Sequence, residues 1–217
     1  MKYEICLFDL DGTLTDPKIG ITKSFQYVLS DFGIYEDLDS LARFIGPPLR
    51  ECFQNSYGFS EADTEKAVAK FREYFIETGM FENTVYPGIP AALQSLKDSG
   101  KILAVATNKV TEYACQILEH FNLDGYFSFV SGDKMDGSLS KIGKQAVIRI
   151  ALDALDLNRE KAAVMIGDRE LDMIGAKEVG IDSIGVTYGY GSGAELENAG
   201  AVFTVDSVEQ CVQLLLS

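Results

Sequence analysis

Residues 4–13 read EICLFDLDGT, an apolar run that ends at two acidic residues and a glycine. Residues two apart in an extended backbone point the same way, so the carboxylates of Asp9 and Asp11 would converge just beyond the end of a strand. Open parallel α/β sheets bind their ligands at that end. Two carboxylates so close repel each other unless a cation lies between them, and hard oxygen ligands suit Mg²⁺. The stretch therefore indicates either a magnesium-dependent active site or an acidic turn in which Gly12 supplies a positive φ.

The rest of the chain alternates short apolar strands with helical patterns. Such alternation, with helices of roughly 10 to 15 residues, is typical of right-handed βαβ units, so the sequence predicts an α/β fold with a parallel sheet. The glycine-rich segment 185–193 lacks the spacing of a dinucleotide site and is interpreted as a loop. After the first strand, the expected strands are 102–106, 127–131, 162–166, 183–186 and 201–205, and the expected helices are 88–99, 110–120, 143–155, 169–179 and 207–216.

Residues 17–84 break this alternation with an almost wholly helical insert. Pro17 stands before it and Pro87-Gly88 follow it, and rigid prolines beside a glycine are expected where two short linkers must hinge. Within the insert, Ser60 begins a capping box that opens a helix. The sequence predicts two domains: an α/β core of residues 1–16 and 85–217, and a smaller all-helical cap of residues 17–84 with helices near 20–32 and 60–79.

Composition limits the partners of this 217-residue chain. The formal net charge of −14 disfavours nucleic acid and anionic membranes, because both are polyanions. No signal-peptide pattern opens the sequence and no stretch approaches roughly 18 apolar residues, so we expect no membrane span. No coiled-coil heptads appear, which is compatible with a monomer and leaves the oligomeric state open. The four cysteines form no Cys-x-x-Cys pair and indicate reduced thiols in a cytoplasmic protein: Cys6, Cys52, Cys115 and Cys211.

Four polar motifs follow apolar runs in a fixed order along the chain. They are Asp-x-Asp-Gly-Thr at 9–13, Thr107, a lysine at 141 or 144, and Gly-Asp-x-x-x-Asp at 167–172. This order resembles the haloacid dehalogenase superfamily of phosphatases, in the subclass with a helical cap after the first motif, and the resemblance spans residues 3 to about 190. It implies a Rossmann-like parallel-sheet core, a cap that acts as a lid, and Mg²⁺-dependent hydrolysis of small phosphorylated metabolites.

The resemblance also implies roles for the acidic residues. Asp9 is the expected nucleophile, which forms an aspartyl phosphate, and Asp11 is the expected general acid and base. Mg²⁺ is expected on the Asp9 carboxylate, the Asp11 main-chain carbonyl and Asp168. Asp172 lies one helical turn after Asp168, and we expect it in the outer shell of the metal. The alternative for Asp172 is an acid that favours its own helix N-terminus.

Two further motifs would bind the phosphoryl group. The Thr107 hydroxyl and the Asn108 backbone amide are expected at the junction of a strand and a helix N-terminus, where both could donate to a phosphoryl oxygen. The lysine of the family opens a helix whose first apolar residue comes three positions later. This spacing matches Lys144 followed by Val147, and Lys141 is the reserve candidate.

The substrate must be chosen by the cap. The segment RFIGPPLR at 43–50 resembles the specificity loop of phosphoglycolate phosphatase-like members, with Arg43, Gly46 and Arg50 as expected substrate-binding residues. The alternative is a helix-capping turn with solvated arginines. Pyrophosphate, nucleoside monophosphates and sugar phosphates are alternative substrates, which would make the chain a pyrophosphatase or a 5′-nucleotidase.

Three other functions fit the sequence less well. A phosphosugar mutase would place a histidine in the cap, and residues 17–84 contain none. A haloacid dehalogenase needs no acid at position 11. A phospho-acceptor signalling module carries its acceptor after the third strand rather than the first.

Overall fold

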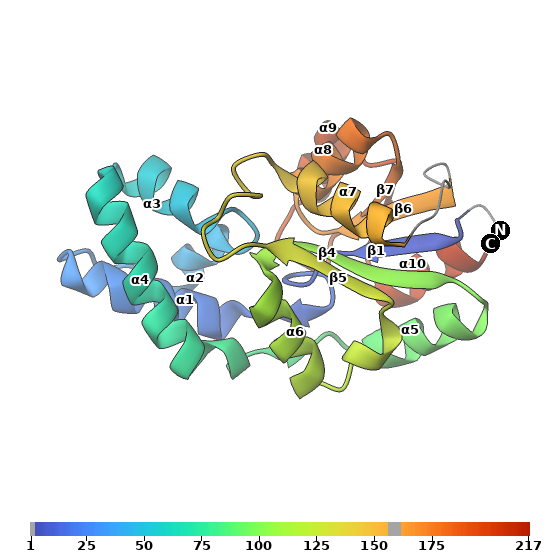
Figure 1. The fold of residues 1–217 in the computed structure, drawn as a ribbon, viewed down its shortest axis with the longest axis horizontal. Coiled ribbons are helices and arrows are strands. Elements are labelled where there is room, and N and C mark those ends of the chain that lie inside the picture. The colour runs from blue at the N-terminus through green and yellow to red at the C-terminus, as the bar shows by residue number, and fades with distance from the viewer. Residues whose placement is uncertain (1–2, 156–161) are drawn as a thin grey trace. The chain divides into compact units, whose positions relative to one another are not determined.

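The computed structural model describes residues 3–155 and 162–217. These form two compact units, one made of the residues up to Thr15 together with Val85–Ser217, the other of Asp16–Thr84 (Figure 1). The sequence-based limits of the insert differ from these at one residue, Asp16. The first unit contains the sheet and the motifs, and the second is helical.

A six-stranded parallel sheet forms the middle of the first unit (Figure 1). The strand order is β5-β4-β1-β6-β7-β8, and every neighbouring pair is parallel. Successive strands are added outward from β1 first on one side and then on the other, which is the doubly wound order of Rossmann-like sheets. The predicted fold class is confirmed. The strands are β1 (Ile5–Phe8), β4 (Ile102–Val110), β5 (Phe129–Asp133), β6 (Ala163–Gly167), β7 (Asp182–Val186) and β8 (Phe203–Val205).

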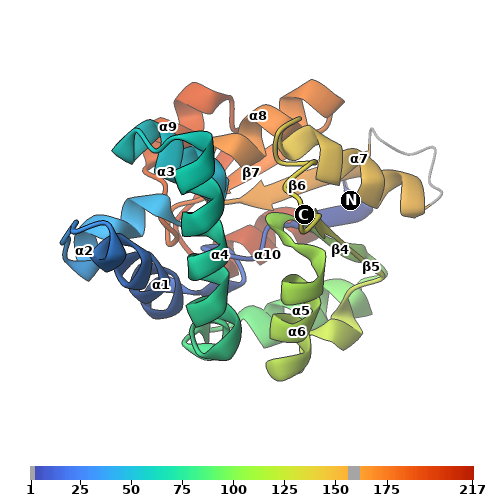
Figure 2. The same ribbon diagram turned by 60° about the vertical axis from the view of Figure 1, so that its left-hand side comes forward.

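Helices cover both faces of this sheet. They are α5 (Ile89–Asp98), α6 (Thr111–His120), α7 (Lys144–Ala154), α8 (Glu170–Val179), α9 (Gly193–Ala199) and α10 (Val208–Leu216). Figures 1 and 2 show α7, α8 and α9 on one face and α5, α6 and α10 on the other. Ile5 and Leu7 of β1 pack in one core with Val147 of α7, whereas Phe8 lines a small apolar cavity with Leu93 of α5. Both faces of β1 are therefore buried, which explains its continuous apolar run.

The second unit packs its helices around aromatic side chains. The ring of Phe25 lies 4.8 Å from that of Phe44 and 5.2 Å from those of Phe53 and Phe71, measured between centroids. Ser60 forms the expected N-terminal cap of a helix, because its side chain accepts from the Asp63 amide at 3.2 Å. The helices are α1 (Lys18–Asp31), α2 (Leu38–Leu41), α3 (Leu49–Tyr57) and α4 (Glu61–Glu77), with short 3-10 helices at Ala42–Phe44, Gly79–Phe81 and, in the first unit, Asp124–Tyr126.

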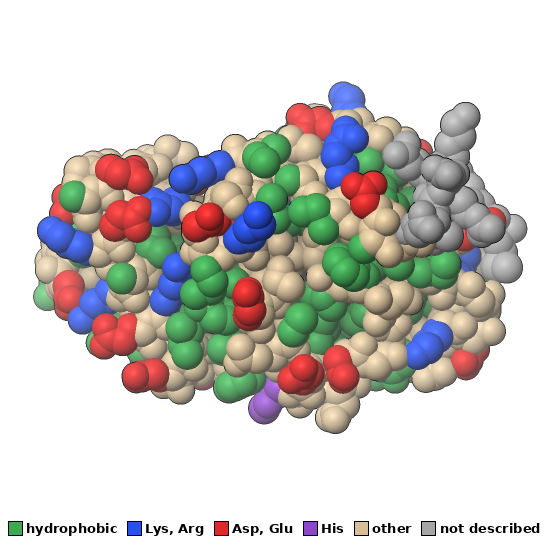
Figure 3. Space-filling view, in the orientation of Figure 1, with side chains coloured by type: hydrophobic (Ala, Val, Ile, Leu, Met, Phe, Trp, Pro, Cys, Tyr) green, Lys and Arg blue, Asp and Glu red, His purple; other side chains and the backbone are tan. Residues whose placement is uncertain are grey.

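Two short strands occupy the linkers between the units. β2 (Thr15–Asp16) pairs with β3 (Thr84–Val85) in a two-stranded sheet. The chain thus leaves and re-enters the first unit through paired segments. In the described residues no helix is long and apolar enough to cross a membrane. On the described part of the face in Figure 3, lysine and arginine side chains are scattered among acidic ones.

One strand differs from the sequence-based expectation in a way that matters for the site. β4 was expected to end at 106 and instead continues to Val110, because it goes on pairing with β5 as far as Asp133. The pairing shifts register between Ala106 and Val110, which is the sign of a bulge or irregularity. A Cβ on Gly132 of β5 would lie 2.4 Å from the Lys109 carbonyl oxygen, so a glycine is needed where this irregular segment comes close.

Candidate active site

Asp9 and Asp11 lie directly beyond the carboxyl end of β1. The Asp9 amide donates to the Ile166 carbonyl at 2.9 Å and so extends the pairing of β1 with β6 by one residue. The chain then turns sharply: the Gly12 amide donates to the Thr15 carbonyl at 2.8 Å, and Gly12 has a φ of +83°. Both aspartates are buried. The acidic turn with a positive φ at Gly12 is therefore present, and the two buried carboxylates lie in it.

A cluster of three buried carboxylates forms where β1 and β6 end. Carboxylate oxygens of Asp9, Asp168 and Asp172 all lie within 4.8 Å of one another. Asp168 follows the last residue of β6, and Asp172 lies in the first turn of α8. Asp172 also accepts from the Arg169 amide at 3.1 Å, so it caps its helix while it contributes to the cluster.

Asp168 is held on both oxygens. Oδ1 accepts from the Thr13 hydroxyl at 3.3 Å, and Oδ2 accepts from the Tyr190 amide at 2.8 Å. A Cβ on Gly12 would lie 2.1 Å from Asp168 Oδ2, and one on Gly189 would lie 2.5 Å from it. Glycine at these two positions lets two segments approach the carboxylate. Segment 185–193, interpreted from the sequence only as a loop, therefore supports the site, and glycines placed just beyond a strand end were the signal for it.

The structure brings one of the two candidate lysines to the carboxylates. Lys144 begins α7 and is 3% exposed, and its Nζ lies 2.9 Å from Asp9 Oδ1 and 2.7 Å from Asp172 Oδ1. Lys141 is exposed in the preceding loop. Gly143 between them breaks the direction of the chain with a φ of +119°. The geometry favours Lys144 as the lysine of the third motif.

The second motif differs from the expectation. Thr107 is buried, and its Oγ1 accepts from the Lys109 amide at 3.2 Å. Because β4 continues to Val110 and α6 begins at Thr111, the prediction that Thr107 and Asn108 lie at a helix N-terminus is wrong. Asn108 is half-buried in the irregular end of β4.

Lys109 was not among the candidates from the sequence. Its Nζ lies 2.5 Å from Asp11 Oδ2, and both side chains are nearly buried. Burial raises the pKa of the Asp11 carboxyl above its ordinary value, although Lys109 opposes the shift. No local pattern marks Lys109, because its position depends on the irregular pairing of β4 with β5.

Burial also sets the charge balance of the carboxylate cluster. It raises the pKa of Asp168 well above its ordinary value, and repulsion from Asp172 and Asp9 adds to the shift. Burial raises the pKa of Asp172 to about 6, although Lys144 opposes it. For Lys144 burial alone would lower the pKa, but Asp172 and Asp9 outweigh it and raise it.

The cluster fits a divalent metal ion. Three carboxylates and one ammonium group leave an excess of negative charge in a buried place, which a cation would offset. The donors are hard oxygens, as Mg²⁺ requires. The Asp11 carboxylate is outside this set and pairs with Lys109, so a metal contact from Asp11 would come from its main-chain carbonyl, as the family resemblance implies.

The candidate substrate-binding residues of the cap lie in the helical unit. Arg43 Nη1 lies 2.7 Å from Glu36 Oε2, and Arg50 pairs with Glu61 at 3.3 Å and, more closely, with Glu65. Gly46 has a φ of +101°, which the turn between the arginines requires. Both arginines therefore have carboxylate partners within their own unit.

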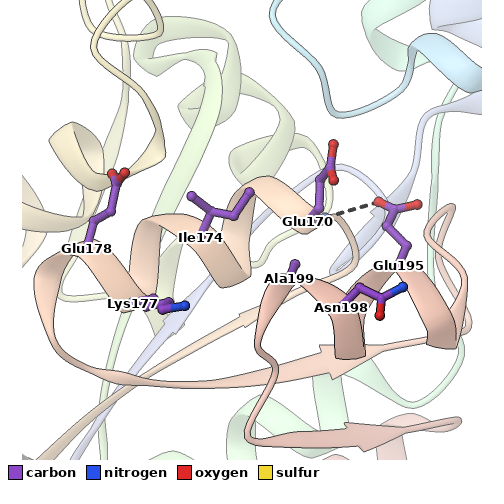
Figure 4. Close-up of a pocket in the computed structure, with 7 residues that line it drawn as sticks. All are labelled: Glu170, Ile174, Lys177, Glu178, Glu195, Asn198 and Ala199. Atoms are coloured by element: carbon purple, nitrogen blue, oxygen red, sulfur yellow. Dashed lines mark hydrogen bonds between the residues drawn. The ribbon is translucent and has the colours of Figure 1, made fainter.

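A surface groove lies between α8 and α9 (Figure 4), and none of the three clustered aspartates lines it. At its edge Glu195 Oε1 accepts from the Glu170 amide at 3.0 Å and from Arg169 Nε at 2.9 Å. Glu195 thus ties α9 to the beginning of α8. The groove is lined by Glu170, Ile174, Lys177, Glu178, Glu195, Asn198 and Ala199.

Comparison with known proteins gives consistent matches. Residues 6–186 match the family model described as haloacid dehalogenase-like hydrolase. A 5′-nucleotidase of Pseudomonas aeruginosa is 47% identical over 197 residues, which are 90% of this chain and 88% of that protein. A phosphoglycolate phosphatase of Aquifex aeolicus is 30% identical over 212 residues, 97% of this chain and 96% of that one. The crystal structure of a predicted phosphatase from Clostridium acetobutylicum has a TM-score of 0.95 and 51% identity, and the match covers 100% of this chain and 99% of that one.

Proposed function

Since the chain is a phosphatase of the haloacid dehalogenase-like hydrolase family, we propose that it hydrolyses small phosphomonoesters at the cluster around Asp9, Lys144 and Asp168. The observation that carries the proposal is the convergence of three buried carboxylates and one buried lysine at the carboxyl ends of β1 and β6. Ligands of doubly wound sheets bind at this edge. The four free cysteines support a cytoplasmic location.

The reaction proceeds in two displacements. An oxygen of Asp9 attacks phosphorus, the bond from phosphorus to the leaving oxygen breaks, and Asp11 gives that oxygen its proton. A water molecule then attacks the aspartyl phosphate and gives a proton to Asp11, the bond from phosphorus to Asp9 breaks, and inorganic phosphate leaves. The first step needs a carboxylate as nucleophile and both steps need a second carboxylate as proton carrier, and the DLD sequence supplies the two.

One positive group and two hydrogen-bond donors are assigned to the oxygens of the phosphoryl group. Lys144, at 2.9 Å from Asp9, holds the nucleophile and would contact a phosphoryl oxygen. The Thr107 hydroxyl accepts from the Lys109 amide, so its own proton can be donated to another oxygen. We assign the backbone amide of Asn108 as a second donor to a phosphoryl oxygen.

Mg²⁺ is part of the proposal. Asp9, Asp168 and the main-chain carbonyl of Asp11 would hold it, with Asp172 in the outer shell. When bound, the ion neutralises charge on the phosphoryl oxygens. The excess of buried carboxylates over ammonium groups supports this assignment.

The substrate class rests on two observations. The 47% identity to a 5′-nucleotidase exceeds the 30% identity to a phosphoglycolate phosphatase. This difference favours a nucleoside monophosphate over phosphoglycolate as the substrate. Hydrolysis of nucleoside monophosphates is therefore the second candidate function, beside a general phosphomonoesterase. In the cap, Arg43, Gly46 and Arg50 are proposed to select the non-reacting part of the substrate, which would require the arginines to exchange their glutamate partners for it.

A phosphate-release screen tests the proposal. The purified chain is incubated with nucleoside 5′-monophosphates, phosphoglycolate, sugar phosphates and pyrophosphate, each with Mg²⁺ and with a chelator. We expect release from phosphomonoesters with Mg²⁺, fastest from nucleotides, and none with the chelator. Absence of release from every phosphomonoester, or equal release with the chelator, would contradict it.

A further inference from the structure

The ion pair of Lys109 with Asp11 shares no residue with the ion pairs of Lys144. Lys109 Nζ lies 2.5 Å from Asp11 Oδ2, and the side chains of the two residues are 7% and 11% exposed. The pair joins the irregular end of β4 to the turn after β1, residues separated by 98 positions in the sequence. A buried ion pair adds little net stability, because the desolvation of both charges offsets their attraction, so its contribution here is sought in geometry.

The two oxygens of Asp11 differ in their surroundings. Oδ2 is held by Lys109, whereas the buried Oδ1 has no hydrogen-bond partner among the residues that the structure describes. A buried polar atom without a partner is rare in folded proteins and needs an explanation, such as a catalytic role. Only Oδ1 can therefore exchange a proton with a substrate without first breaking the ion pair.

The backbone of β4 places Lys109 where its side chain can hold Asp11 Oδ2. The register of β4 against β5 shifts between Ala106 and Val110, and irregular pairing of this kind redirects side chains beside active sites. The Lys109 amide also donates to Thr107 Oγ1 at 3.2 Å. Gly132 leaves room for the Lys109 carbonyl, which a Cβ would approach to 2.4 Å.

We infer that Lys109 is a positioning residue, which holds Asp11 by Oδ2 so that Oδ1 faces the leaving oxygen of the substrate and carries the proton. The inference rests on the proposed function. In the first displacement the electron pair of the phosphorus–oxygen bond stays on the leaving oxygen, and the proton on Oδ1 goes to that oxygen. In the second, Oδ1 takes a proton from the attacking water. Lys109 remains an ammonium group throughout and contacts neither phosphorus nor the leaving group.

A series of phenyl phosphates tests the inference, because the need for proton transfer grows with the basicity of the leaving group. We would measure kcat and KM for substrates from p-nitrophenyl to p-methoxyphenyl phosphate with the wild type, Lys109→Met and Lys109→Arg. We expect Lys109→Met to lower kcat for p-methoxyphenyl phosphate on the order of tenfold or more, and for p-nitrophenyl phosphate by less than about threefold. Lys109→Arg should recover most of the loss.

The matched comparisons make each outcome decisive. In Asp11→Asn, kcat should fall with the basicity of the leaving group as steeply as in Lys109→Met. The double variant should show no steeper fall, since both residues act through one proton. Lys177→Met, an exposed lysine on α8, should follow the wild type. The test uses the ratio of kcat values for two substrates in one protein sample, so partial misfolding of Lys109→Met does not affect the result.

Three results would overturn the inference. An unchanged dependence in Lys109→Met, a uniform fall on all substrates, or a rise in KM at constant kcat would show that Lys109 does not act through proton transfer. In each case the wild type still releases phosphate, so the proposed function stands. A wild type inactive on this series and on every phosphomonoester of the release screen would contradict the proposed function and the inference together.

Discussion

The ammonium group of Lys144 lies between Asp9 and Asp172, 2.9 Å from an oxygen of the first and 2.7 Å from an oxygen of the second. All three side chains are almost fully buried. A single lysine therefore offsets two carboxylates, one directly beyond β1 and the other in the first turn of α8. Its position ties the start of α7 to the end of β1 and to the start of α8.

This contact separates the two candidate lysines. A lysine that contacts the nucleophile and the phosphoryl group stabilises charge in the bound substrate and in the transition state. We expect Lys144→Ala to lower kcat/KM by two orders of magnitude or more, on the order of 3 kcal/mol. Lys141→Ala, at an exposed lysine, should change kcat/KM by less than about threefold. The reverse result would move the third motif to Lys141, and no effect in either variant would count against the assigned chemistry.

The nucleophile can be tested directly. Asp9→Asn keeps the size of the side chain and removes its charge, so turnover should be abolished while the melting temperature changes little. Rapid acid quench of the wild type with ³²P-labelled substrate should leave label on the peptide that contains Asp9. An Asn variant with full activity, or label on another residue, would exclude this mechanism.

Metal binding should depend unequally on the two acids after β6. Asp168 is held on both oxygens by Thr13 and Tyr190 and has no lysine partner among the ion pairs of the described residues, whereas Asp172 is already paired with Lys144. We expect Asp168→Asn to abolish activity or to raise the Mg²⁺ concentration for half-maximal activity at least about tenfold, and Asp172→Asn to raise it less. Calorimetric titration with Mg²⁺ provides the second readout. Equal and small effects would place the metal elsewhere.

The pKa shifts predict a pH-dependent stabilisation by metal. Asp172 has a folded pKa of about 6 against 3.8 for the free group, and the pKa of Asp168 is raised as well. Their contribution to the stability of the metal-free protein is thus largest below pH 3.8 and is lost as pH rises through the folded pKa values. Mg²⁺ competes with these protons, so the rise in melting temperature on adding Mg²⁺ should be small at about pH 5 and larger at about pH 8. Asp168→Asn should remove most of the difference, and a rise independent of pH would contradict the metal site.

The sequence allowed part of this site to be predicted, for a physical reason. Asp9, Asp11 and Asp168 follow apolar strands directly, and the carboxyl ends of neighbouring parallel strands meet at one edge, so local pattern and fold class were enough to bring them together. Lys144 was indicated by the family resemblance instead, because the lysine of the family opens a helix whose first apolar residue, here Val147, comes three positions later.

Lys109 and the hydrogen bond from the Tyr190 amide to Asp168 could not be found in this way. The position of Lys109 depends on a register shift between β4 and β5, and that of Tyr190 on how the chain folds back after β7 to reach Asp168. Both are properties of packing between distant segments. The strand was expected to stop at 106 because the run of apolar residues stops there, whereas pairing with β5 carried it to Val110.

The cap arginines give the last prediction. Arg50 is paired with Glu61 and Glu65 in its own unit, so binding a second anionic group of a substrate would require it to leave a carboxylate partner. Exposed pairs of this kind contribute only about 0 to 1 kcal/mol, a cost that substrate binding can offset. We expect Arg50→Met to raise KM severalfold for substrates with a second anionic group and to leave p-nitrophenyl phosphate unchanged. Glu65→Gln, which removes one of the two carboxylate partners of Arg50, should lower KM for the same substrates. Equal KM values in all three proteins would show that Arg50 serves only the structure of the cap.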